Sequence, residues 1–99
     1  MAKRRILWDR AALHYFSQAI GYIRKDSEQN AGKVKKEILA KIRELSHRPE
    51  IHPADKYKRN NAGQYRAFEL HRYRVAYLVK EDQIIITRVR HTSQEPQDY

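Results

Sequence analysis

Basic side chains and two histidines lie along the stretch from Gln64 to His91, and their types indicate chemistry on an anion. A guanidinium group holds two phosphate oxygens at once through its planar fork of N–H donors. Histidine exchanges protons near neutral pH, so His91 is the best candidate for an acid or a base. The alternation of the surrounding residues predicts that Arg74 and His91 share one face of a sheet. Such a face could bind a phosphate group and move a proton beside it.

The same stretch predicts three consecutive β-strands, at residues 65–70, 73–80 and 83–90, joined by two very short connections. Apolar and polar residues alternate in the last two strands, as they do on the opposite faces of a sheet. The apolar face consists of Tyr73, Val75, Tyr77, Val79, Ile84 and Ile86, whereas Arg74, Lys80, Gln83, Thr87 and His91 point the other way. The first face must be covered by other elements, and the second is expected to be open.

Two amphipathic helices that precede the strands are expected to cover the apolar face. A short apolar strand at residues 4–8 ends at Asp9, a plausible N-cap. The first helix carries the stripe Leu13, Phe16, Ile20 and Ile23, and the second, capped by Asp26 or Ser27, carries Ala31, Val34, Ile38, Ile42 and Leu45. We therefore predict an α+β domain in which a two-helix hairpin packs on one face of a four-stranded, mostly antiparallel sheet.

The segment from Arg48 to Gly63 shows no hydrophobic period and is rich in turn residues. Its cationic run contains Lys56, Lys58 and Arg59, which we expect to contact an anion. The histidines at positions 47 and 52 lack a third ligand at a useful spacing, so no metal site is expected. The chain also has no glycine-rich phosphate loop, and no cofactor is expected.

Length and composition narrow the class of protein. Ninety-nine residues allow a single domain, with residues 92–99 expected as an irregular tail. The formal net charge of +9 attracts polyanions, and the absence of cysteine excludes disulfides and a thiolate nucleophile. The N-terminal residues are too polar for a signal peptide, and no run is long enough to span a membrane. These features predict a cytoplasmic protein.

The order of strand, helical hairpin, basic loop and three-stranded meander resembles the RelE/ParE toxin superfamily of bacterial type II toxin–antitoxin systems. The resemblance covers about the whole chain, and its strongest parts are Tyr-Arg-Val-Ala-Tyr at residues 73–77 and Ile-Ile-Ile-Thr-Arg-Val-Arg-His at residues 84–91. It implies a growth-inhibiting, plasmid-stabilising bacterial toxin that a partly disordered cognate antitoxin wraps and neutralises.

The resemblance implies one of two activities. RelE-like members cut mRNA in the ribosomal A site, whereas ParE-like members have the same fold but poison DNA gyrase by protein contact. Our expectation from the sequence is a ribosome-dependent, metal-independent mRNA endoribonuclease. The alternative is a gyrase inhibitor, and a non-toxic RNA-binding module is the second alternative.

For the nuclease, the resemblance implies a set of site residues. Arg66 and Arg74 match basic positions of the RelE pattern and would be catalytic together with His91. Lys56, Lys58 and Arg59 would hold phosphate groups, and Tyr99 would stack on a base. Glu69 would serve as a base or pair with Arg74.

The position of Arg66 depends on the length of one turn. A two-residue turn at His71-Arg72 places Arg66 on the face of Val75 and Tyr77, and a three-residue connection places it beside Arg74. Neither His nor Arg favours the positive φ that a tight hairpin requires, so the longer connection is credible.

Overall fold

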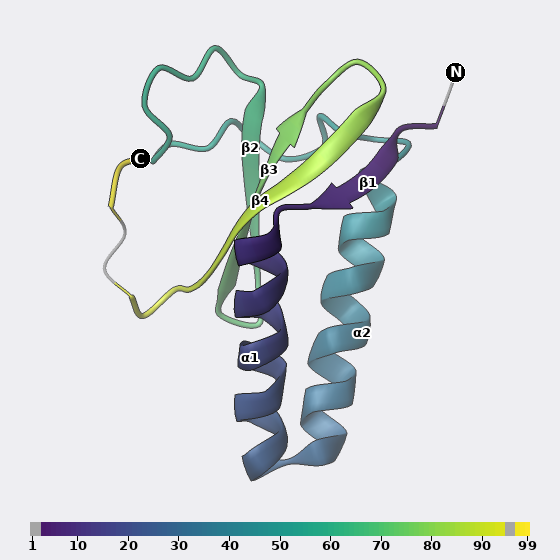
Figure 1. Cartoon of the computed structure of the whole chain (residues 1–99), viewed down its shortest axis with the longest axis vertical. Coiled ribbons are helices and arrows are strands. Elements are labelled where there is room, and N and C mark those ends of the chain that lie inside the picture. The colour runs from purple at the N-terminus through teal and green to yellow at the C-terminus, as the bar shows by residue number, and fades with distance from the viewer. Residues whose placement is uncertain (1–2, 95–96) are drawn as a thin grey trace.

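The computed structural model describes residues 3–94 and 97–99 and arranges them in two layers, a helical hairpin and a sheet (Figure 1). The elements in chain order are β1 (Arg5–Trp8), α1 (Arg10–Asp26), α2 (Glu28–Glu44), β2 (Tyr65–Leu70), β3 (Tyr73–Val79) and β4 (Gln83–His91). The sheet has the order β1-β4-β3-β2; β1 runs parallel to β4 and the other pairs are antiparallel. The α+β fold predicted from the sequence is confirmed.

A single residue, Ser27, connects the two helices. Its backbone N–H donates to the carbonyl of Ile23 at 2.9 Å and so ends α1. Its hydroxyl accepts the backbone N–H of Asn30 at 3.0 Å and so begins α2. Asp9 caps α1 as predicted, because its carboxylate accepts the backbone N–H of Ala11 at 3.0 Å. These caps satisfy backbone groups that every helix end leaves unpaired.

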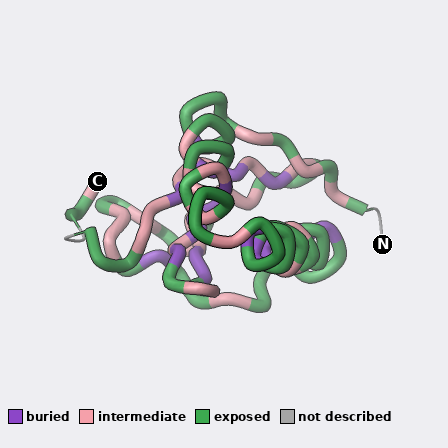
Figure 2. The backbone as a smooth tube through the Cα atoms, turned by 90° about the horizontal axis from the view of Figure 1, so that it is seen from below, coloured by how far each residue is buried: buried purple, intermediate pink, exposed green. Residues whose placement is uncertain are grey.

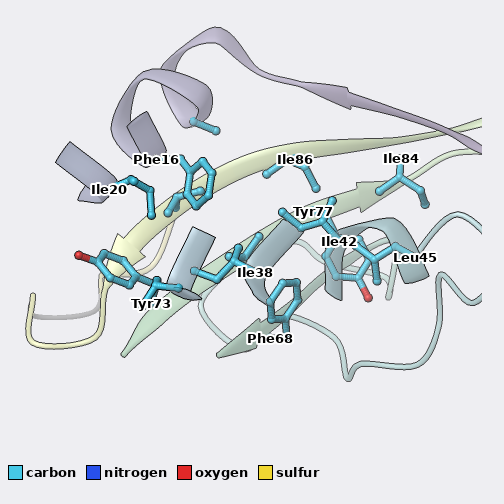
Figure 3. Packing of buried hydrophobic residues seen from close by; sticks show 14 of the residues in the cluster. Phe16, Ile20, Ile38, Ile42, Leu45, Phe68, Tyr73, Tyr77, Ile84 and Ile86 are labelled. Atoms are coloured by element: carbon cyan, nitrogen blue, oxygen red, sulfur yellow. The ribbon is translucent and has the colours of Figure 1, made fainter. Parts of the chain in front are cut away.

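The core lies between the helices and one face of the sheet, where aromatic and branched side chains interdigitate (Figure 3). Buried segments accordingly lie toward the middle of the molecule and exposed segments at its periphery (Figure 2). The helices bury Phe16, Ile20, Ile38 and Ile42, and Leu45 is buried directly after α2. The strands bury Val75, Tyr77, Ile84, Ile86 and Val89. One predicted core residue is wrong: Leu13 is 50% exposed, because α1 turns Ala12 toward the sheet instead.

A β-bulge in β4 changes which residues face the core. Tyr77 pairs with Ile86 and Ala76 pairs with Arg88, so Thr87 lies between them without an opposite residue. An extra residue in one strand reverses the alternation that follows it. The prediction that His91 shares a face with Arg74 is therefore wrong, because His91 pairs with Tyr73 on the core face. Arg88 and Arg90 take the polar face in its place.

The β2–β3 connection is the tight turn rather than the longer one. His71 and Arg72 both adopt left-handed backbone conformations, with φ of 53° and 66°. This geometry matches the right-handed twist of the paired strands, which outweighs the local cost of positive φ in side chains with a Cβ. Arg66 consequently pairs with Tyr77, on the face opposite Arg74.

The segment between α2 and β2 lies along the outer edge of β2. Ala54 forms an isolated antiparallel bridge with Arg66, and the backbone N–H of Asp55 donates to the carbonyl of Tyr65 at 2.8 Å. The Asn61 side chain ties the same segment down by donating to the carbonyls of Asp55 and Tyr65. These bonds fix Asp55 at the edge of the sheet. No helix among the described residues is long and apolar enough to cross a bilayer.

Candidate functional site

The polar face of the sheet carries a pocket of about 490 Å³. Its lining comes from four parts of the chain: the loop before β2, the three strands of the meander, the residues directly after β4 and the C-terminal residues. The lining combines cations, acids and aromatic rings, namely Arg74, Arg88, Arg90, Asp55, Glu69, Tyr57 and Tyr99, together with Ala76, His91, Thr92, Gln94 and Gln97. Such a mixture suits an anionic ligand that also carries flat rings.

Asp55 forms the floor of the pocket and is only 2% exposed. Its carboxylate accepts Arg74 Nη2 at 2.8 Å, the backbone N–H of Tyr57 at 3.1 Å and the hydroxyl of Tyr99. Burial alone would raise the pKa of Asp55, but the hydrogen bonds from Tyr99, Arg74 and Tyr57 outweigh it and hold the pKa below its ordinary value. Asp55 therefore stays ionised and joins the loop, β3 and the C-terminal residues.

Arg74 is held between two carboxylates. Its Nη1 donates to Glu69 Oε2 at 2.9 Å, while its Nη2 donates to Asp55. Its guanidinium carbon lies 4.8 Å from the ring centroid of Tyr57. Burial acts to lower the pKa of Arg74, but the two carboxylates raise it overall. Arg74 lines the pocket as predicted, with its charge balanced by protein carboxylates.

Tyr99 lies against the basic loop, and Figure 1 shows the C-terminal end beside that loop. Its backbone N–H donates to the carbonyl of Tyr57 at 2.9 Å, and its carbonyl accepts the N–H of Arg59 at 2.6 Å. Burial and then the neighbouring Asp55 raise the pKa of Tyr99, so its hydroxyl stays protonated and donates to that carboxylate. Residues 97–99 are thus fastened to the loop, while residues 95–96 of the expected tail lie outside the described part.

Arg88 and Arg90 also line the pocket, and neither was predicted as a site residue from the sequence. Neither forms an ion pair within residues 3–94 and 97–99, in contrast to Arg74. The guanidinium carbon of Arg88 lies 4.1 Å from the ring centroid of Tyr99. The spacing of three between Ile86 and Val89 is the signal that could have revealed the bulge, and with it the outward direction of both arginines.

His91 lies at the end of β4, where its ring packs edge-on against Tyr73 with 5.0 Å between centroids. It lines the pocket although it pairs on the core side of the strand. Its Nδ1 accepts the backbone N–H of Ser93 at 3.0 Å, and a backbone N–H can only donate. The neutral imidazole therefore carries its proton on Nε2, and that nitrogen is a donor.

The remaining predicted site residues lie outside the pocket lining. Arg66 Nη1 donates to the carbonyl of His52 at 2.7 Å and holds the loop against β2. Lys56 Nζ lies 5.3 Å from the ring centroid of Tyr57, and Lys58 Nζ lies 5.5 Å from that of Tyr99. Arg59 contacts Tyr99 through its backbone. The structure brings Arg74, His91 and Tyr99 together at one pocket, with Lys56 and Lys58 against tyrosine rings that line it and Arg66 on the other face of the sheet.

A family model described as the ParE toxin of the type II toxin–antitoxin system, parDE, matches residues 6–96. The chain belongs to this ParE toxin family. The superfamily resemblance drawn from the sequence is thereby confirmed, and the chain is the toxin of a type II pair with a cognate antitoxin as its partner. A search of curated protein sequences finds no match.

The family match does not specify the chemistry of the pocket, which must be inferred from the residues that line it. Within residues 3–94 and 97–99, no cluster of three or more His, Asp or Glu side chains is arranged to hold a metal ion. The groups in the pocket that can act on an anionic ligand are the guanidinium groups of Arg88 and Arg90 and the imidazole of His91. Their arrangement can bind a phosphate and supply a proton next to it.

Proposed function

We propose that this ParE-family toxin is a ribosome-dependent endoribonuclease of the bacterial cytoplasm, and that the pocket on the polar sheet face is its active site. The observation that carries the proposal is one pocket that holds a histidine and two arginines without an ion pair among the described residues. A protein surface that only docks on another protein does not require that combination. RNA cleavage does, since charge develops on a phosphoryl group and a leaving oxygen needs a proton.

In the proposed reaction, Arg88 and Arg90 bind the non-bridging oxygens of the scissile phosphate. The ribose 2′-oxygen attacks phosphorus and releases its proton to water, while the bond from phosphorus to the 5′-oxygen breaks. The imidazolium form of His91, whose Nδ1–H has the Ser93 hydroxyl 2.7 Å away as its acceptor, donates the Nε2 proton to that leaving oxygen and is left as a neutral imidazole. The products are a 2′,3′-cyclic phosphate and a 5′-hydroxyl end.

In this proposal the other candidates take different parts. Arg74 and Glu69 form an ion pair at the pocket wall, so Glu69 acts as the partner of Arg74 rather than as a base. Lys56, Lys58 and Arg59 extend the positive surface beside the pocket for neighbouring phosphates of the RNA. Arg66 supports the loop from the other face of the sheet.

Inhibition of DNA gyrase by protein contact is the second candidate, and the ParE family match favours it. That activity needs no proton donor and no free phosphate-binding arginine. The two functions are separated by two assays on the same purified protein. Cleavage of mRNA on translating ribosomes, with gyrase supercoiling unchanged, supports the nuclease. Intact mRNA with inhibited supercoiling overturns it in favour of the gyrase inhibitor.

A growth test covers the remaining alternative of a non-toxic RNA-binding module. Expression of the chain alone is expected to stop growth, and co-expression with its antitoxin is expected to restore it. Normal growth on expression of a folded protein would contradict both toxic activities.

A further inference from the structure

Tyr99 is placed in a way that does not suit stacking on an RNA base. Its ring already has Arg88 over it, with the guanidinium carbon 4.1 Å from the ring centroid, and Lys58 Nζ lies 5.5 Å from the same centroid. A base that stacked on the ring face covered by Arg88 would have to displace that cation. The contact between the Tyr99 ring and the guanidinium group of Arg88 therefore indicates the role of Tyr99.

The hydroxyl of Tyr99 is fixed by Asp55, a residue that takes no part in the proposed reaction. Asp55 is 2% exposed, and it accepts donors from the loop, from β3 and from Tyr99. An ionised carboxylate inside the protein forms strong hydrogen bonds and holds its donors in a narrow range of positions. The Tyr99 ring is thus anchored at its hydroxyl end, and its face is directed at Arg88.

We propose that Asp55 is a positioning residue: it locks Tyr99, and the locked Tyr99 ring holds Arg88 in place as the phosphate-binding cation of the pocket. This inference rests on the proposed RNA cleavage, because the ligand that Arg88 would take is an RNA phosphodiester. The chain of contacts runs from a buried carboxylate through an aromatic hydroxyl and ring to a guanidinium group.

Stacking leaves the donors of Arg88 available. The N–H groups of a guanidinium lie in its own plane, so a ring packed on its face uses none of them. The same side chain can then present two parallel N–H groups to two phosphate oxygens. Fixing the long arginine side chain before the ligand arrives also reduces the rotamer entropy that binding must remove. Asp55 acts on the phosphate only through Tyr99 and Arg88.

The first test reads the position of Arg88 directly. In ¹⁵N-labelled protein the Nε–H resonance of Arg88, assigned with Arg88→Lys, is expected to be shifted by the ring current of Tyr99. Tyr99→Leu gives the unshifted position. Asp55→Asn and Tyr99→Phe, which weaken or remove the anchoring bond but keep the ring, are expected to move the resonance toward that position. Glu69→Gln is the matched control, because it removes the other carboxylate from Arg74 without touching Tyr99.

The second test measures binding of a short 2′-O-methyl RNA, which cannot be cleaved, by fluorescence anisotropy. Loss of the ring in Tyr99→Leu is expected to weaken binding about tenfold, the scale of a desolvated cation–π contact. Asp55→Asn and Tyr99→Phe are expected to weaken binding a few-fold. Glu37→Gln, which removes a carboxylate that pairs with His71 outside the pocket lining, is expected to leave binding unchanged.

The outcomes separate the positioning role from the proposed function. An Arg88 resonance that keeps its wild-type position in both Asp55→Asn and Tyr99→Phe overturns the inference, even if these variants melt at lower temperature. Wild-type protein that binds no RNA contradicts the nuclease, while the resonance still tests the positioning of Arg88 by Tyr99. If the resonance moves but RNA affinity stays unchanged in all variants, Arg88 does not bind the phosphate and the proposal fails.

Discussion

Arg74 and Arg90 lie opposite each other across β3 and β4 and both line the pocket, but within the described residues only Arg74 is paired with carboxylates. The two arginines therefore have different tasks, although both occupy the polar face. Arg74 joins Asp55 to Glu69 and so fastens the loop to the sheet. Arg90 keeps its charge available to a ligand.

Replacing Arg74 with alanine is expected to destabilise the fold. The change leaves the carboxylate of Asp55 buried without its cation, and loss of one partner of a buried pair costs roughly 3–5 kcal/mol. Arg90→Ala is the matched control, since it removes the same side chain without breaking an ion pair described here. Urea denaturation checks the difference. Equal losses of unfolding free energy in the two variants would contradict the assigned tasks.

Replacing Arg88 and Arg90 together with glutamine is expected to weaken RNA binding with little change in stability. Removing each phosphate-binding cation should reduce the slope of log affinity against log salt by about 0.7 for a single strand. Anisotropy titrations from low to moderate salt provide the measurement, with Arg24→Gln on the helical hairpin as the control for net charge. A slope that falls no further in the double variant than in the control would count against the pocket as the phosphate site.

His91→Ala tests the proton donor. If His91 protonates the leaving oxygen, mRNA cleavage on ribosomes should fall at least about 100-fold, because general acid catalysis typically contributes that much. Binding of the uncleavable RNA should change little, because phosphate binding is assigned to the arginines. His14→Ala, on the exposed side of α1, serves as the control. Undiminished cleavage by His91→Ala would remove the histidine from the mechanism.

His52 gives the fold a pH dependence. Burial and then nearby Lys41 lower the pKa of His52 below 6.5, and its Nε2 is buried without a hydrogen-bond partner among the described residues. The unfolded chain then takes up a proton at a higher pH than the folded protein. The contribution of neutral His52 to the free energy of unfolding is fully present above pH 6.5. It is lost as the pH falls below 6.5 and through the lower pKa of the folded protein.

The expected size of that effect is up to about 1 kcal/mol of unfolding free energy between pH 7.5 and 5.5. His52→Phe should flatten the dependence and keep the ring packing on Phe68, where the centroids are 4.9 Å apart. The control variant His14→Gln should keep the wild-type pH dependence of the unfolding free energy. Denaturation at both pH values measures the effect, and a variant at position 52 with the wild-type pH dependence would disprove the assignment.

Arg72→Gly tests the tight turn on which the position of Arg66 depends. At a φ of 66°, glycine removes the strain of a side chain in the left-handed region, which outweighs its greater flexibility in the unfolded chain. We expect a gain of up to about 1 kcal/mol in unfolding free energy. The same change at Arg59, which lacks a positive φ, should give no gain. A loss of stability in Arg72→Gly would indicate a different turn.

The elements of this protein follow from local patterns in its sequence. The apolar stripes and the Asp9 cap predicted the helical hairpin. The alternation in β3 predicted the sheet face on which this hairpin packs. Apolar side chains that recur with a period of 3.6 or 2 lie on one side of a helix or strand. These features depend only on neighbouring residues in the sequence and can therefore be predicted from it. Residue types and alternation also made Arg74 and His91 candidates, whereas Tyr99 was implied only by the family resemblance.

Which residues meet at the pocket was decided by the tertiary structure. The bulge at Thr87 exchanged His91 for Arg88 and Arg90 on the polar face, and the turn at His71 and Arg72 kept Arg66 off it. A shift of one residue in strand pairing reverses the face of every residue beyond it, and only packing against the other strands and helices sets that shift. Asp55 lies in a segment without any period, so its burial depends on partners from β3 and the C-terminal residues that folding brings together.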